Sequence, residues 1–232
     1  MALQSQRFQE VGRFAMLAVM VLTLQGAALA ADTPPGTYGA AMRWYESEAK
    51  AGNARAQYLL GLSLEQGARG EIDLPAALGW YRKSADQGVA EAQLKLALAL
   101  HFGQGVPVDL TAARSWYEKA ARQGLPEAAY NLAYLQQTGR GGPVQMDAAI
   151  DGYKQAAAGG IVQALSALGA LYAQGDGIAQ DMVAAYAWLD LAVAAGVETA
   201  RPLREAIGAE LTVTEREAAG LLVQKWQAGP SF

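Results

Sequence analysis

Few side chains in this sequence could carry out chemistry. His101 is the only histidine among 232 residues, and the chain has no cysteine. A zinc site or a histidine-based catalytic triad needs several suitable side chains close together. The residues at multiples of 36 positions from His101 differ in polarity, and they are Glu65, Gln137 and Ala173. We therefore expect His101 to be a solvated residue near a helix end, and we expect no metal site and no cofactor.

Carboxylates and glycine-rich stretches are the other candidates for chemistry. Glu91 and Glu127 lie 36 residues apart, which favours a repeated solvated helix face over an acid–base pair. The glycine-rich run 139–142 lacks the Gly-Lys-Ser/Thr sequence of a phosphate-binding loop, and the run 175–177 lacks the spaced carboxylates of a calcium loop. With 18 Lys and Arg against 22 Asp and Glu, the chain also lacks the basic excess typical of nucleic-acid binding.

The regular spacing that relates these positions is the main feature of the sequence. Glycines recur every 36 residues, and alanine columns and Trp-Tyr pairs keep the same period. The glycines are Gly52, Gly88, Gly124, Gly160 and Gly196, and the aromatic pairs begin at Trp44, Trp80 and Trp116. A fixed period of about 20–50 residues is typical of solenoid proteins, in which each repeat packs only against its neighbours.

One period predicts a hairpin of two helices. In residues 53–88, apolar or small side chains at 56, 60, 61 and 64 share one helix face, and Gly67 follows as a helix stop. Asp73 is the expected N-cap of the second helix. The buried stripe of that second helix is expected to contain Ala77, Trp80, Tyr81 and Ala85.

The residues in these columns resemble a known family. Ala54 to Gly61 reads A-x-A-Q-Y-x-x-G, Gly103 to Asp109 reads G-x-G-V-P-x-D, and Ala113 to Gly124 reads A-x-x-W-Y-x-K-A-A-x-x-G. This pattern is similar to Sel1-like repeats, which are relatives of tetratricopeptide repeats. The resemblance implies an all-α fold, a right-handed α/α superhelical solenoid of helix hairpins, and a role as an adaptor protein.

The same period predicts the boundaries of the domain. We expect a half-repeat as N-terminal cap helix at 37–52 and capping helices at 197–232, with four repeats between them at 53–88, 89–124, 125–160 and 161–196. The last helix has two overlapping capping boxes, Thr212 with Glu215 and Thr214 with Glu217. Capping repeats with altered faces keep a solenoid soluble, and we expect a monomer.

Residues 1–30 have the features of a secretory signal peptide. Arg7 and Arg13 give a basic start, residues 14–24 carry no charge, and Ala28-Leu29-Ala30 matches a small-x-small cleavage site. Cleavage after Ala30 would leave a linker at 31–36 and no stable membrane span. An uncleaved anchor is the alternative, although this apolar stretch is short against the ~20 residues that a span needs. We expect an exported protein, periplasmic or secreted, and the family resemblance implies a bacterial one.

Alignment with tetratricopeptide-like hairpins predicts a groove for a protein or peptide partner, because in that family the first helix of each unit lines the concave side. The expected lining residues are Arg55, Tyr58 and Leu62 in the first unit, Glu91, Leu98, His101 and Phe102 in the second, and Glu127, Tyr130 and Tyr134 in the third. Mixed aromatic and polar side chains suit a peptide. Tyr58 and Tyr130 are equally compatible with a packing role.

The sequence thus predicts an exported, non-enzymatic scaffold that binds a protein or peptide partner in its groove, in regulation or assembly of the bacterial envelope. An enzymatic or small-molecule-binding role is the alternative, because some secreted Sel1-like proteins act on β-lactam or cell-wall compounds. Those proteins have a cysteine framework that this chain lacks, and this difference argues against the alternative.

Overall fold

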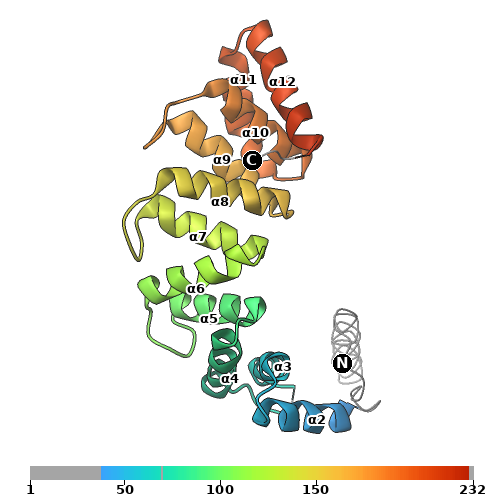
Figure 1. Cartoon of the computed structure of the whole chain (residues 1–232). Coiled ribbons are helices and arrows are strands. Elements are labelled where there is room, and N and C mark those ends of the chain that lie inside the picture. Colours follow the sequence, from blue (N-terminus) through green and yellow to red (C-terminus); the bar gives the residue numbers. More distant parts are fainter. Residues whose placement is uncertain (1–37, 69, 230–232) are drawn as a thin grey trace, which may run out of the picture. The chain divides into compact units, whose positions relative to one another are not determined.

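The computed structural model describes residues 38–68 and 70–229, and within them every regular element is a helix (Figure 1). The chain divides into two compact units, Met1–Val89 and Ala90–Phe232. The described helices of the first unit are α2 (Tyr38–Lys50), α3 (Ala54–Glu65) and α4 (Leu74–Asp86). Those of the second unit are α5 (Ala90–Phe102), α6 (Leu110–Arg122), α7 (Pro126–Thr138), α8 (Met146–Ala158), α9 (Val162–Gln174), α10 (Met182–Ala194), the 3₁₀ helix η1 (Glu198–Ala200), α11 (Arg201–Glu210) and α12 (Val213–Gln227). The predicted all-α fold, a solenoid of helix hairpins, is confirmed.

Local sequence signals set the helix ends. Three aspartates cap the second helices of their hairpins, each accepting a hydrogen bond at Oδ1 from the backbone N–H three residues later, and these pairs are Asp73 with Ala76 (3.0 Å), Asp109 with Ala112 (2.9 Å) and Asp181 with Ala184 (2.8 Å). Gln145 stands in this place before α8 and makes no such side-chain bond. The capping box formed before α12 is that of Thr212 with Glu215. The glycines of the 36-residue period all have φ between 89° and 102°, a left-handed backbone that favours glycine.

In the first unit, α3 packs on α2 and α4 packs on α3. Tyr45 and Leu60 lie in the apolar core between α2 and α3. Two side-chain bonds fasten α4 to the preceding helix: Ser84 Oγ donates to the Ala54 carbonyl at 2.7 Å, and Gln87 Nε2 donates to Gln57 Oε1 at 2.8 Å.

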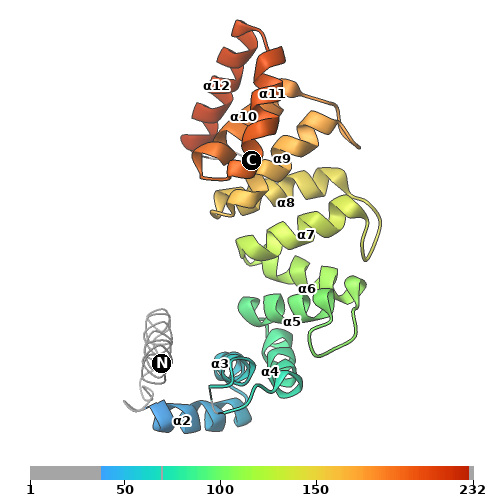
Figure 2. The same ribbon diagram turned by 180° about the vertical axis from the view of Figure 1, so that it is seen from behind.

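In the second unit, the helices from α5 to α10 stack in chain order (Figures 1 and 2). Glutamine side chains join helices within a hairpin and between hairpins. Gln123 Nε2, directly after α6, donates to Gln93 Oε1 of α5 at 2.8 Å, and Gln155 Nε2 of α8 donates to the Ala121 carbonyl of α6 at 2.9 Å. Arg114 of α6 also donates to the Pro143 carbonyl at 2.9 Å, which fastens the connector before α8.

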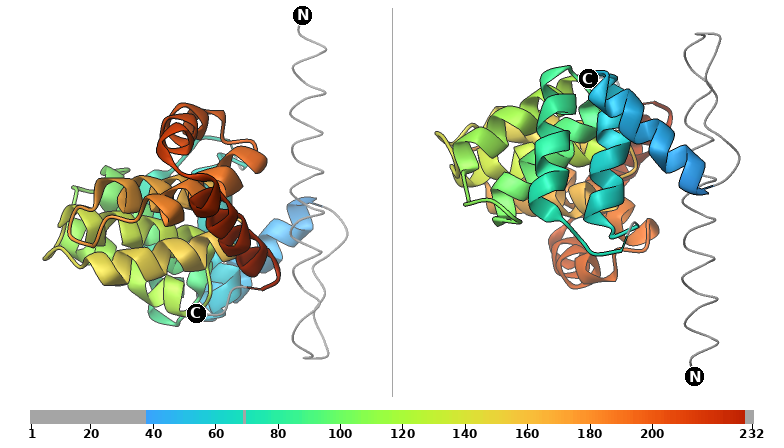
Figure 3. Two further views of the ribbon diagram at one scale, coloured as in Figure 1. Left: turned by 90° about the horizontal axis from the view of Figure 1, so that it is seen from above. Right: turned by 90° about the horizontal axis from the view of Figure 1, so that it is seen from below.

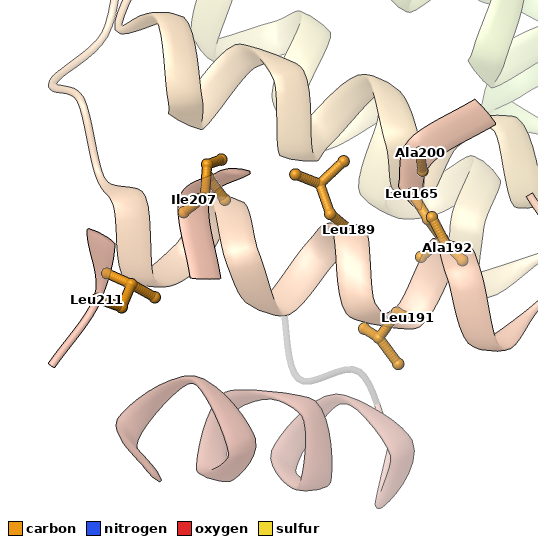
Figure 4. Packing of buried hydrophobic residues seen from close by; sticks show 8 residues of the cluster. Leu165, Leu189, Leu191, Ala192, Ala200, Ile207 and Leu211 are labelled. Carbon is orange, nitrogen blue, oxygen red and sulfur yellow. The ribbon is translucent and has the colours of Figure 1, made fainter. Parts of the chain in front are cut away.

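The last hairpin is closed by the helices that follow it. Leu189 and Leu191 of α10 share a buried cluster with Ile207 and Leu211, which come from α11 and the residue after it (Figure 4). Helix α12 also packs against α10, and the view from above shows it crossing the end of the stack (Figure 3). The apolar face that a further repeat would cover is therefore covered by α11 and α12.

The aromatic pairs divide their roles in a way that the sequence did not predict. Tyr81, Tyr117 and Tyr153 are 2%, 0% and 2% exposed, so the tyrosine column lies in the core. Trp80 and Trp116 are only half-buried, and lysine ammonium groups lie over their rings, Lys83 at 4.2 Å and Lys119 at 3.8 Å from the ring centroids. Trp80 is therefore at the edge of the predicted buried stripe, where it packs against the core of α2 and α3. It precedes the buried tyrosine by one residue and so points about 100° away around the helix.

Candidate functional site

A tyrosine and a polar acceptor join the two helices in each of the first three hairpins. The Tyr81 hydroxyl donates to Glu65 Oε2, Tyr117 Oη lies 3.2 Å from His101 Nδ1, and Tyr153 Oη donates to Gln137 Oε1 at 2.8 Å. In the fourth hairpin the corresponding residues are Leu189 and Ala173. The variable positions 65, 101 and 137 thus provide a polar partner for each buried tyrosine hydroxyl. Position 173 is apolar, and the tyrosine is replaced by leucine in that hairpin.

The expectation of a solvated His101 was wrong. The residue is 5% exposed, because Tyr117 from α6 covers it with a ring whose centroid lies 5.9 Å from that of the imidazole. Burial lowers the pKa of His101, and the positive charge of Arg140 lowers it further. The imidazole is therefore neutral at neutral pH.

Two exposed aromatic rings lie against this buried histidine. Phe102 is 58% exposed and stacks on His101 with ring centroids 4.3 Å apart and planes at 13°. Tyr134 from α7 is 39% exposed and lies 6.4 Å from the imidazole with planes at 25°. The Arg140 guanidinium lies 6.0 Å from the Tyr134 ring centroid. We call His101, Phe102, Tyr134 and Arg140 the aromatic patch.

Three of these four residues, His101, Phe102 and Tyr134, were predicted from the sequence as groove residues, and Arg140 was not. Arginine 140 follows α7 directly after Gly139, whose φ of 68° ends the helix and turns the chain. Its position next to Tyr134 depends on the path of this connector, and no periodic column contains it. The available signal was the glycine-rich run 139–142, which we had tested only against the sequence of a phosphate-binding loop.

The other predicted groove residues lie in several environments. Tyr130 is half-buried and packs edge-on against Tyr153 at 5.5 Å. Tyr58 is half-buried and lies 5.9 Å from Tyr81, with the Arg55 guanidinium 5.0 Å from its ring centroid. The remaining positions carry no ring: Leu62, Glu91 and Leu98 are half-buried, and Glu127 is exposed. Arg55, Tyr58 and Leu62 belong to the first unit, whereas the aromatic patch lies wholly in the second.

Residues 47–50 in α2 read Ser-x-x-Lys, a motif of serine β-lactamases that was not among the predicted site residues. Ser47 is exposed. Lys50 Nζ lies 3.1 Å from Glu46 Oε1 with the lysine side chain 66% exposed. A catalytic lysine of this kind needs a desolvated surrounding, whereas Lys50 is solvated and ion-paired.

The geometry of the aromatic patch suits binding better than catalysis. The hydrogen-bond partner of His101 is a tyrosine hydroxyl, whereas a histidine base is normally oriented by a carboxylate. Among the residues that the structure describes, no three His, Cys, Asp or Glu side chains are grouped closely enough to hold a metal ion. None of the helices at 38–68 and 70–229 combines the length and apolarity needed to cross a membrane.

These features define an α-solenoid repeat protein with an exposed aromatic patch on the first helices of successive hairpins. The model of the Sel1 repeat matches residues 54–89, 90–125, 126–161 and 162–197, and the chain belongs to the Sel1 repeat family. Proteins of this family are typically non-enzymatic and generally bind protein partners.

Two solved structures show similarity in sequence and in fold. A Sel1 repeat protein from Oxalobacter formigenes is 32% identical with a TM-score of 0.63, over 67% of this chain and 64% of that one. A protective antigen of uropathogenic Escherichia coli strains, with an SLR fold, is 31% identical with a TM-score of 0.71, over 96% of this chain and 47% of that one. The chain thus spans between about half and two thirds of these relatives. No curated protein matches it.

Proposed function

We propose that this protein is an exported, non-enzymatic scaffold that binds a protein or peptide partner at the aromatic patch. The exposure of two aromatic side chains carries the proposal. Phe102, at the end of α5, is 58% exposed, and Tyr134, in the first helix of the next hairpin, is 39% exposed. Both rings lie against His101, and exposed apolar side chains that gather in one patch mark interaction sites. Aromatic residues and arginine are common anchors of protein interfaces.

The patch is also held in place before any partner arrives. Phe102 stacks on a histidine that is itself fixed by Tyr117, so little side-chain freedom is lost on binding. Because His101 is neutral, a partner that covers it does not bury an unpaired charge. Arg140 provides the one cation of the patch, which favours a partner with an apolar or aromatic side chain close to a carboxylate.

Export and a place in the bacterial envelope are part of the proposal. Residues 1–30, whose sequence indicates a signal peptide, lie outside the described residues. The similarity to a protective antigen of uropathogenic Escherichia coli supports a location that host immunity can reach. Family members generally bind protein partners, which supports the scaffold role, and we place this role in envelope regulation or assembly as part of the proposal.

This function is tested by cross-linking and pull-down from envelope extract. The affinity of the protein for the captured partner is then measured. The variant Phe102→Ala with Tyr134→Ala should weaken binding by about thirtyfold or more, since anchor residues are worth ~2 kcal/mol or more. The control variant Gln163→Ala with Gln174→Ala changes exposed residues of the fourth repeat and should bind normally. Equal binding by the patch variant and the wild type, with helicity unchanged, would refute the proposal.

A further inference from the structure

A second recessed surface lies at the C-terminal end of the second unit, apart from the aromatic patch. It is a cleft of about 710 Å³ lined mainly by α8, α10 and α12, with Tyr172 of α9, whereas the aromatic patch comes from α5, α7 and the connector after α7. Pockets that bind drug-sized ligands or single peptide segments have volumes of roughly 300–1,000 Å³. The cleft is therefore large enough for one or two side chains and the backbone between them.

One end of this cleft is apolar and aromatic. Trp188 and Trp226 meet edge to face with ring centroids 4.7 Å apart, and both line the cleft with Leu191 and Leu222. Leu222 is 44% exposed, because α12 packs through Ala219, Val223 and Trp226 instead. An exposed leucine beside two tryptophans offers a place for an apolar side chain of a ligand.

The other end of the cleft is acidic. An adjoining hollow of about 670 Å³ shares Asp151, Lys154, Tyr172 and Asp181 with the cleft and adds the carboxylates of Asp147 and Glu215. Burial raises the pKa of Tyr172, and the charges of Asp181 and Asp151 raise it further. The negative charge of these two carboxylates is therefore felt at the Tyr172 hydroxyl in the lining. With four carboxylates and one lysine in its lining, the hollow favours cations.

We propose that this cleft binds a peptide segment of a partner protein in which an aliphatic or aromatic side chain stands a few residues from lysine or arginine. The apolar side chain lies between Leu222 and the tryptophan pair, and the basic side chains lie over Asp147 and Asp151. Lys225 lines the apolar end, so it repels a basic group there and fixes the direction of the peptide. This docking site does not depend on the function proposed for the aromatic patch.

Fluorescence anisotropy with a set of labelled 12-residue peptides tests the proposal on the intact chain. Each peptide has Leu or Phe at one position and Lys or Glu two to four residues away. In control peptides, Ser replaces either the apolar or the charged residue. We expect the Leu–Lys and Phe–Lys peptides to bind, and we expect exchange of Lys for Glu, or of the apolar residue for Ser, to weaken binding by at least about tenfold. Added salt should weaken the Lys peptides further.

Matched variants locate the binding. Leu222→Ser should weaken the Leu–Lys peptides by about tenfold, whereas Leu221→Ser, a neighbour that is 65% exposed and does not line the cleft, should leave them unchanged. Asp147→Asn with Asp151→Asn should remove the preference for Lys over Glu, and Asp176→Asn, an exposed residue of the connector before α10, should keep it.

Several outcomes would overturn the assignment of this site. The proposal fails if no peptide of the set binds, if Glu peptides bind as well as Lys peptides, or if Leu221→Ser and Leu222→Ser act alike. It also fails if Phe102→Ala with Tyr134→Ala abolishes binding of these peptides, since the aromatic patch would then hold them. If Phe102→Ala with Tyr134→Ala loses binding of a natural partner but still binds these peptides, the two sites are separate and both proposals are supported.

Discussion

The Nδ1 atom of His101 lies 3.2 Å from the hydroxyl oxygen of Tyr117, sixteen residues further along the chain. This contact places the one histidine of the sequence inside the hairpin formed by α5 and α6. It also supports the exposed ring of Phe102 from behind. The histidine therefore shapes a binding surface through packing, and its ionisation affects the stability of the hairpin.

The first prediction concerns pH. Burial holds the pKa of His101 below its ordinary value of 6.5 in the folded state, so on acidification the unfolded chain takes up this proton first. The stabilising effect of the neutral histidine is present above pH 6.5 and is lost as the pH falls toward the folded pKa. Urea unfolding at pH 7.5 and 5.5 should show a larger loss for the wild type than for His101→Gln.

The glutamine variant is a natural control, because Gln137 accepts a hydrogen bond from Tyr153 in the next hairpin. It keeps an acceptor for Tyr117 and removes the titrating group. Carboxylates elsewhere titrate equally in both proteins, so only the difference between the two pH profiles bears on His101. Parallel profiles would mean that the histidine is not held neutral by the fold.

The second prediction compares the two aromatic columns. Tyr117 is fully buried, so Tyr117→Ala should lower the free energy of unfolding by ~3–5 kcal/mol. Trp116 is half-buried under Lys119, so Trp116→Ala should cost only about 1–2 kcal/mol, within the ordinary range for single substitutions. Chemical denaturation of both variants decides the order, and a larger loss at Trp116 would contradict the packing described for α6.

The repeat and its helix ends could be predicted from sequence because they depend on local signals. Asp109 before α6 and Thr212 before α12 are cap residues that act within three positions of themselves. A period of 36 residues needs no knowledge of contacts at all. The family, the hairpins and most of the helix ends follow from such features.

The site could be predicted only in part, since its properties depend on packing between helices. Nothing near His101 in sequence shows that Tyr117 will cover it, and Arg140 reaches Tyr134 only because of the connector path. In the last helix, Leu221, Leu222 and Trp226 lie at helical spacing in the sequence, yet Leu221 and Leu222 of α12 are 65% and 44% exposed. The period ends at Gly196, so no column remained to show that Ala219 is the buried position.

The third prediction concerns export. The basic start, the apolar stretch at 14–24 and Ala28-Leu29-Ala30 should direct cleavage after Ala30. Amino-terminal sequencing of the protein from a periplasmic extract should therefore begin at Ala31. A full-length product that stays with the membrane fraction would favour an uncleaved anchor instead. Replacing Ala28 and Ala30 by larger residues should block the cleavage.

The last prediction uses two glycines of the second unit with opposite surroundings. Gly220 lies inside α12, and a Cβ there would meet open space. Gly220→Ala should stabilise the protein by about 0.5–1 kcal/mol, because alanine restricts the unfolded chain and suits a helix.

Gly141 has a φ of 73°, and a Cβ there would lie 2.3 Å from the carbonyl oxygen of Leu110 in α6. Gly141→Ala should therefore cost ~1–3 kcal/mol for the left-handed backbone, and the collision with a backbone atom adds to this cost. Thermal and urea unfolding of the two variants should give shifts of opposite sign. A stable Gly141→Ala protein would show that the connector before α8 does not dock on α6 as described, and Arg140 would then lose its fixed place beside Tyr134.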